Sequence, residues 1–111
     1  MALFRVSGHF SVGGIPLSHA ERETYVEKVA EILERGLSNC KTIKKFVVAR
    51  QMRPPNPSKN EPDLAEEITV EGADRSAVFE TYRNDPAHLS MVAELARLEW
   101  LTWSIVVYQI S

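Results

Sequence analysis

Tyr82 and His88 flank a short turn and carry two groups suited to acid–base chemistry. Asp85 is a good N-cap and Pro86 suits the first helical position, so His88 is expected at the third residue of a helix. There the partial positive charge of the helix N-terminus opposes imidazolium formation and favours the neutral, basic ring. The phenol of Tyr82, at the end of a preceding helix, can donate a hydrogen bond across the turn. The pair could therefore offer a base and a donor to one small molecule.

Two N-terminal elements are predicted from local signals. Residues 3–12 alternate in the manner of a strand. Its apolar face carries Phe4, Val6, Gly8, Phe10 and Val12, and its mixed face carries Arg5, Ser7 and His9. Ser18 followed by Glu21 fits a capping box that opens an amphipathic helix. Gly36 is the expected end of that helix.

The remaining elements predict an alternation of strands and helices. Strands are expected from residue 42 or 43 to 52, at 65–72 and at 102–110, and helices from residue 74 or 76 and from Asp85 to about Trp100. The proline-rich segment from Pro54 to Pro62 forbids regular structure. This β-α-β-β-α(broken)-β order predicts a ferredoxin-like α+β fold: one domain, residues 1–111, with an antiparallel sheet and helices on one face.

The hydrophobic pattern also predicts a second copy of the chain as a partner, and the sequence argues against nucleic acid and membrane as partners. The last strand is apolar on both faces, so a second copy is expected to cover the sheet in a two-fold homodimer. Thirteen Lys and Arg against fifteen Asp and Glu give a charge of −2, without the basic excess of a nucleic-acid binder. No apolar run approaches a membrane span, and the N-terminus lacks a secretion-type signal. With Cys40 as the single cysteine, a cytoplasmic location is expected.

The segment Thr81–Leu89, TYRNDPAHL, together with the final strand at Ile105–Tyr108, resembles the stress-responsive dimeric A/B barrel family. The resemblance implies the same ferredoxin-like dimer. The best-known catalytic member of that family, the plant olivetolic acid cyclase, closes a linear polyketide by an intramolecular aldol reaction. The resemblance to this cyclase implies a catalytic pair that needs no cofactor, with His88 as the base and Tyr82 as the hydrogen-bond donor. Val107 stands where the family commonly has an Asp able to hold the histidine.

An enclosed apolar pocket would be needed for such a substrate. The residues expected to bind it are Tyr25, Val29, Phe46, Trp100 and His9. The leading hypothesis is therefore a small-molecule enzyme resembling polyketide cyclases. A non-catalytic stress-type or ligand-binding protein is the first alternative, and a cofactor-independent monooxygenase of the related barrels is the second.

For each residue with a predicted functional role, a purely structural role is also possible. His88 can simply make a local hydrogen bond, Tyr82 can be a core aromatic, and Trp100 can serve packing alone. His9 can line a cavity, join a dimer interface or pair with the acidic third strand. No Gly-rich phosphate loop and no spacing of metal ligands is present, so no metal is predicted.

Overall fold

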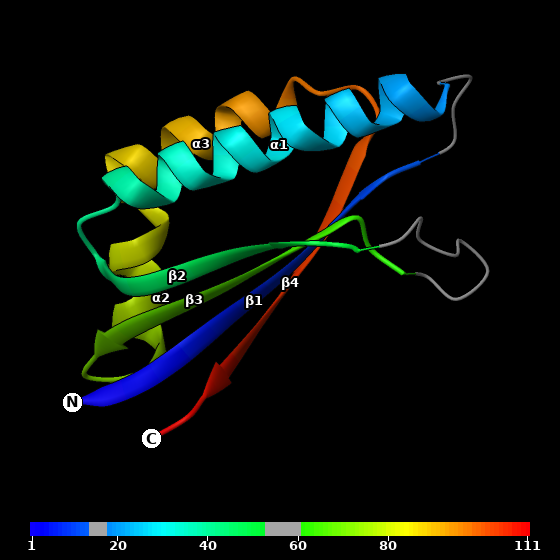
Figure 1. Ribbon diagram of the computed structural model, residues 1–111. Helices are drawn as coiled ribbons and strands as arrows, with labels where there is room; N and C mark the ends of the chain where they lie inside the picture. The colour runs from blue at the N-terminus through cyan, green and yellow to red at the C-terminus, as the bar shows by residue number, and fades with distance from the viewer. Residues whose placement is uncertain (14–17, 53–60) are drawn as a thin grey trace.

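The computed structural model describes residues 1–13, 18–52 and 61–111 of the chain (Figure 1). In these ranges an antiparallel four-stranded sheet is covered on one face by three helices. The elements follow the order β1 (Ala2–Val12), α1 (His19–Asn39), β2 (Ile43–Arg50), β3 (Leu64–Gly72), α2 (Arg75–Arg83), α3 (Pro86–Ala96) and β4 (Leu101–Gln109). The strand order is β2-β3-β1-β4. The predicted ferredoxin-like α+β fold is confirmed.

The core lies between the helices and the apolar face of the central strands. β1 pairs with β3 on one side and with β4 on the other. Its alternate residues Phe4, Val6, Phe10 and Val12 are all buried against the helices. Because side chains along a strand alternate between the two faces of the sheet, Arg5, Ser7 and His9 of β1 lie on the face opposite the helices.

The N-terminus of α1 follows the sequence prediction, but its end does not. Ser18 and Glu21 form the complete capping box. The helix then passes through Gly36 and ends at Asn39, so the predicted end at Gly36 is wrong. Gly36 serves a close helix contact instead, because a Cβ there would lie 2.7 Å from the side chain of Met91 on α3. The missing side chain lets α1 and α3 pack closely.

The later boundaries also differ by a few residues from prediction. β2 ends at Arg50, two residues before Met52. α3 begins at Pro86 as expected but ends at Ala96, where the N–H groups of Arg97 and Leu98 turn back to Glu94 and Leu95. Most of the Pro54–Pro62 segment lies outside the described residues.

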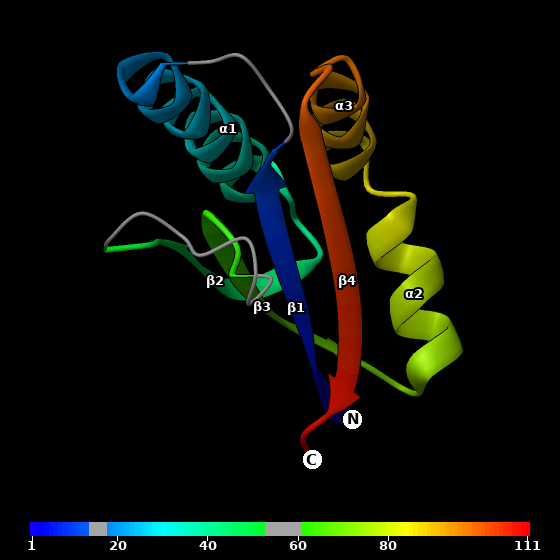
Figure 2. The same cartoon turned by 90° about the vertical axis from the view of Figure 1, so that its right-hand side faces the viewer.

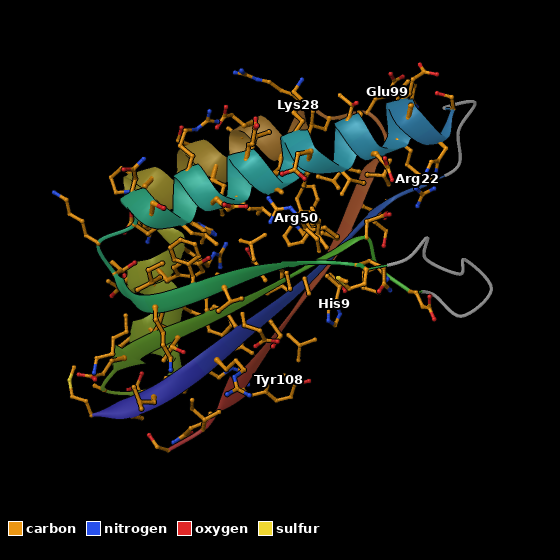
Figure 3. The ribbon with its side chains drawn as sticks, in the orientation of Figure 1. His9, Arg22, Lys28, Arg50, Glu99 and Tyr108 are labelled. Carbon is orange, nitrogen blue, oxygen red and sulfur yellow. The ribbon has the colours of Figure 1, made fainter. Side chains whose placement is uncertain are left out.

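The face of the sheet opposite the helices is mixed in character. His9 and Tyr108 project from this face (Figure 3). Arg5 and Ser7 both contact the Glu67 carboxylate across the β1–β3 pair. Three apolar or aromatic residues of this face are well exposed: Val47, Val106 and Tyr108. Of the helices in the described ranges, none is long and apolar enough to span a membrane.

Candidate functional site

A cavity of about 210 Å³ lies between the sheet and the pair α2 and α3. Figure 2 shows both helices on the β4 side of the molecule. The residues that line the cavity are mostly apolar: Val6, Phe10, Phe79, Met91, Val92, Leu95, Trp103 and Ile105. Four further residues supply polar groups: Glu66, Tyr82, Arg83 and His88. An apolar hollow with a few convergent polar groups is the usual form of a small-molecule site.

Tyr82 and His88 meet at the wall of this cavity. Their ring centroids are 4.3 Å apart and their planes are inclined by 47°. Nδ1 of His88 lies 3.3 Å from the backbone carbonyl oxygen of Arg83. A carbonyl oxygen only accepts hydrogen bonds, so Nδ1 carries the proton and Nε2 of the neutral ring is left with its lone pair. The Arg83 carbonyl thus orients His88, although Val107 replaces the Asp common in the resembling family.

The surroundings keep both rings uncharged at neutral pH. Burial lowers the pKa of His88, and the Arg83 charge acts in the same direction, against the hydrogen bond to Arg83 O and the charge of Asp85. Burial also raises the pKa of Tyr82, with the charge of Glu66 as the next contribution. A neutral imidazole can accept a proton, and a protonated phenol can donate a hydrogen bond.

Asp85 fixes the turn that places these two rings. Its Oδ1 accepts from the N–H of Ala87, which caps α3. Its Oδ2 accepts from the N–H of Lys41 and from both the N–H and the hydroxyl of Thr42. The α2–α3 turn is therefore tied to the connection between α1 and β2. Although burial opposes it, these hydrogen bonds hold the pKa of Asp85 below its usual range.

Glu66 is a polar residue of the cavity that the sequence did not single out as a site residue. The side chain belongs to β3, and the residue is 3% exposed. Its Oε2 makes no hydrogen bond within the described part of the chain. Burial raises the pKa of Glu66 to about 7, and the charge of neighbouring Glu67 adds to the effect. A buried ionisable group with a shifted pKa in a cavity is typical of functional sites.

Two features of the sequence could have located Glu66. Within 64–72 it is the only charged residue in phase with the apolar positions Leu64, Ile68 and Val70, so alternation places it on the buried face. Gly8 holds the corresponding place in β1 and pairs with Glu66. A Cβ at Gly8 would lie 2.7 Å from Glu66 Cγ and 2.8 Å from its Oε1. The glycine thus leaves room for the carboxyl group.

The five residues predicted to bind substrate do not line this cavity. The hydroxyl of Tyr25 accepts a hydrogen bond from the backbone N–H of Trp100 at 3.2 Å, and the two rings pack against each other. Val29 is fully buried in the core, and Phe46 packs against the core from β2. His9 lies on the opposite face of the sheet.

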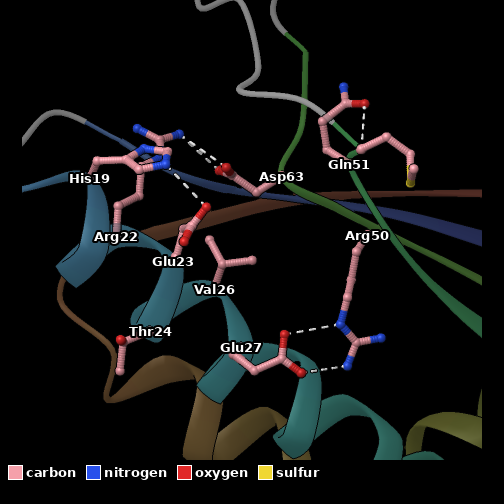
Figure 4. Close-up of a pocket in the computed structure, with 10 residues that line it drawn as sticks. His19, Arg22, Glu23, Thr24, Val26, Glu27, Arg50, Gln51 and Asp63 are labelled. Carbon is pink, nitrogen blue, oxygen red and sulfur yellow. Dashed lines mark hydrogen bonds and ion pairs between the residues drawn. The ribbon is translucent and has the colours of Figure 1, made fainter.

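A larger groove of about 510 Å³ lies elsewhere, between the first half of α1 and the ends of β2 and β3 (Figure 4). Charged side chains along it are paired with one another. Arg22 binds Asp63 at 3.0 Å, and Arg50 binds Glu27 at 2.7 Å. His19 is also paired, with Glu23. The Arg22–Asp63 and Arg50–Glu27 pairs join α1 to the strand ends, whereas the His19–Glu23 pair lies within α1.

The remaining candidates for reactive groups are the Cys40 thiol and clusters of possible metal ligands. Burial, with the charges of Asp85 and Glu66, raises the pKa of the Cys40 thiol to about 11. The thiol is therefore protonated and a poor nucleophile at neutral pH. Within residues 1–13, 18–52 and 61–111, no three His, Cys, Asp or Glu side chains are placed to hold a metal ion.

Comparison with solved structures shows the fold. A dimeric protein of unknown function and ferredoxin-like fold from Bacteroides fragilis matches with a TM-score of 0.71 and 17% identity, covering 97% of this chain and 96% of that one. A DABB family protein with a ferredoxin-like fold, from Mesorhizobium loti, is also similar in structure. These matches confirm the fold expected from the family resemblance. No family model and no curated protein matches the sequence.

Two enzymes with different activities share the fold. SnoaB, a cofactor-independent oxygenase from Streptomyces nogalater, matches with a TM-score of 0.64 and 13% identity over 100% of this chain and 95% of its own. The hydroxynitrile lyase from Passiflora edulis also gives 0.64, with 15% identity over 98% and 94%. Since an oxygenase and a lyase share the architecture, the reaction of this protein has to be argued from its own cavity.

Proposed function

We propose that this protein is a small-molecule enzyme in which His88 is the base and Tyr82 the hydrogen-bond donor of an aldol-type ring closure on a polyketide-like compound. One observation carries the proposal: the two rings are in contact at the wall of an apolar cavity, and the Arg83 carbonyl holds Nδ1 of His88. This arrangement leaves Nε2 as the acceptor. An oriented neutral imidazole beside a phenol is the minimum that proton abstraction next to a carbonyl needs.

The proposed reaction uses only these side chains as acid and base. Nε2 of His88 takes a proton from the carbon next to a carbonyl group, and the electron pair moves to the carbonyl oxygen, which Tyr82 O–H stabilises. The resulting enolate carbon attacks a second carbonyl carbon of the same molecule, so that a C–C bond forms. The new alkoxide then takes the proton from the His88 imidazolium. Protons and electrons balance within the substrate and one histidine.

The size of the cavity limits the substrate. Drug-sized ligands occupy cavities of roughly 300–1,000 Å³, and this one measures about 210 Å³. The reacting part of the substrate is therefore short. The apolar walls favour an unbranched or aromatic carbon skeleton over a sugar or a nucleotide.

The protein is also proposed to act as a homodimer joined through the open face of the sheet. The exposed side chains of Val47, Val106 and Tyr108 on that face support it, and the similar protein from Bacteroides fragilis is described as dimeric. Exposed apolar surface of this kind is a common feature of subunit interfaces. The expected cytoplasmic location stays a prediction.

The test compares two histidines. Short linear poly-β-ketone esters would be offered to the wild type, to His88→Ala and to His19→Ala, with circular dichroism to verify folding. Loss of the base should lower turnover by at least about a hundredfold, whereas His19→Ala, in the paired groove, should leave turnover unchanged. Retained turnover in His88→Ala would refute the base assignment.

The same assay separates the two alternatives. A binding protein would bind the esters and turn none over, and a monooxygenase would consume oxygen as product forms. An oxygen electrode in the reaction vessel distinguishes ring closure from oxygenation. Oxygen uptake in proportion to product would replace the aldol proposal with the oxygenase alternative.

A further inference from the structure

Glu66 is a third acid–base group in the cavity, and the reaction proposed above does not use it. The carboxyl group rises from β3 on the sheet side, while His88 belongs to α3 on the helix side. A ligand lying between the sheet and the helices therefore meets an acid on one wall and a base on the other. Oε2 of Glu66 is buried and makes no hydrogen bond to any residue that the structure describes.

An unpaired buried carboxyl oxygen is costly unless a ligand or water completes its hydrogen bonds. The apolar residues around it offer no such partner. Gly8, directly across the strand pair, provides the space that the carboxyl group occupies. The position is thus shaped around Glu66, whose side chain helps to line the cavity.

We propose that Glu66 binds the substrate in its protonated form, with its carboxyl O–H donating a hydrogen bond to a ketone oxygen, so that the cavity binds neutral carbonyl compounds best while Glu66 holds its proton. The inference rests on the proposed function only in taking this cavity as the substrate site. A neutral carboxylic acid is both a donor and an acceptor, whereas an ionised one can only accept.

The groups that face Glu66 favour the protonated form. Glu67 follows it on β3, and its charge also raises the pKa of Glu66, while Tyr82 and His88, from α2 and α3, are uncharged at neutral pH. Arg83 is the one cation lining the cavity, within residues 1–13, 18–52 and 61–111. Asp85 and the Cys40 thiol lie on the Tyr82 side of the cavity and add no positive charge. Burial then raises the pKa of Glu66 to about 7, so the acid holds its proton below neutrality. Once Glu66 is ionised, a carboxylate ligand would meet a like charge on the sheet side of the cavity.

The test uses acetophenone, a neutral aromatic ketone, and benzoate, a carboxylate of similar size. Their affinities for the wild type would be measured by ligand-observed NMR at pH 6.5 and pH 8.5. Acetophenone should bind about tenfold more weakly at pH 8.5, because the proton on Glu66 is then lost. Benzoate should also bind more weakly at pH 8.5, because Glu66 then carries the same charge as the ligand. In Glu66→Gln the amide N–H₂ donates at any pH, so acetophenone binding should no longer depend on pH.

Equal affinity of wild type for acetophenone at the two pH values would overturn the proposal, as would benzoate binding as tightly at pH 8.5 as at pH 6.5, or failure of acetophenone to bind at pH 6.5. A measurement on the wild type alone guards against misfolding of the variant. With ¹³C-labelled glutamate, the Glu66 carboxyl signal should titrate near neutrality, and its midpoint should move upward when acetophenone is added. Titration near the ordinary value for glutamate would also overturn it.

This experiment is independent of turnover. His88→Ala should keep the pH-dependent binding of acetophenone, because the titrating group is on the opposite wall. If ring closure is disproved while this binding persists, the proposed function fails and the role of Glu66 stands. If binding loses its pH dependence only in Glu66→Gln while no assay detects turnover, the cavity is a selective binding site for ketones.

Discussion

Two of the hollows in the described part of this protein contrast in size and in chemical reactivity. The groove beside α1 is larger, at about 510 Å³ against about 210 Å³, but its charged groups neutralise one another. The smaller cavity under α2 and α3 holds an unpaired carboxyl oxygen and two uncharged rings among apolar side chains. Ionisable groups without partners, rather than volume, distinguish a site that can do chemistry from one that holds the fold together.

The largest expected effect tests whether the groove is structural. Asp63 is buried, and its Oδ2 accepts from the N–H of Val12 at 2.7 Å as well as from Arg22. Asp63→Ala leaves a buried N–H without its acceptor and breaks the ion pair, so the free energy of unfolding should fall by about 3 kcal/mol. Urea denaturation measures this, with Asp63→Asn as the milder control. Turnover per folded molecule should not change, and a large fall in turnover would place the groove in the active site.

The next effect contrasts two tyrosine hydroxyls. Tyr82→Phe removes the proposed donor in the cavity and should lower turnover about a hundredfold, close to 2.7 kcal/mol in activation free energy. Tyr25→Phe removes the acceptor for the Trp100 N–H and should cost only about 1 kcal/mol of stability. Initial rates and thermal unfolding of both variants give the comparison. Equal turnover in the two variants would contradict the role of Tyr82.

A third test uses the pH dependence of stability. The pKa of Glu66 rises from an ordinary 4.5 to about 7 on folding, so between these values the folded state binds more protons than the unfolded state. The contribution of Glu66 to stability is therefore fully present below pH 4.5 and is lost as the pH rises through 7. Between pH 5 and pH 7 the wild type should lose about 2 kcal/mol relative to Glu66→Gln. If the free energies of unfolding of the two proteins changed equally with pH, burial would not raise the pKa of Glu66.

The smallest effect concerns the wall of the cavity. In Gly36→Ala the new methyl group would lie 2.7 Å from Met91, which packs against α1 and lines the cavity. Strain should exceed the gain in helix propensity and leave a net loss of about 1 kcal/mol. The double variant Gly36→Ala with Met91→Ala measures the coupling between the two helices. Additive effects of the two changes would mean that the contact is not under strain.

The success of sequence reasoning followed the range of the interactions. The capping box at Ser18 and the Asp85-Pro86 helix start depend on residues at most three apart, and both are found in the structure. Tyr82 and His88 flank a single turn, so their proximity could be inferred locally. Alternation within β3 could have placed Glu66 on the buried face, but its neighbours come from β1 and α2, which local spacing does not identify.

Errors arose where one signal has two physical causes. Gly36 matched the pattern of a helix end, yet a glycine serves equally well where two helices approach closely. The substrate-binding role expected of Tyr25 and Trp100 stays a prediction. In the structure their rings pack together, and the Tyr25 hydroxyl accepts a hydrogen bond from the Trp100 N–H. Sequence composition identifies aromatic surface without showing which partner covers it.

The bare backbone at Gly8 links positions 8, 66 and 105. A methyl group on residue 8 would lie 2.7 Å from Glu66 Cγ and 2.9 Å from Ile105 Cδ1. A larger residue at 8 would thus require a shorter or reoriented side chain at 66. Across homologues the two positions should covary, with an acidic residue at 66 accompanying glycine at 8. That covariation would show which homologues keep an ionisable residue on the sheet wall of the cavity and which have an entirely apolar wall.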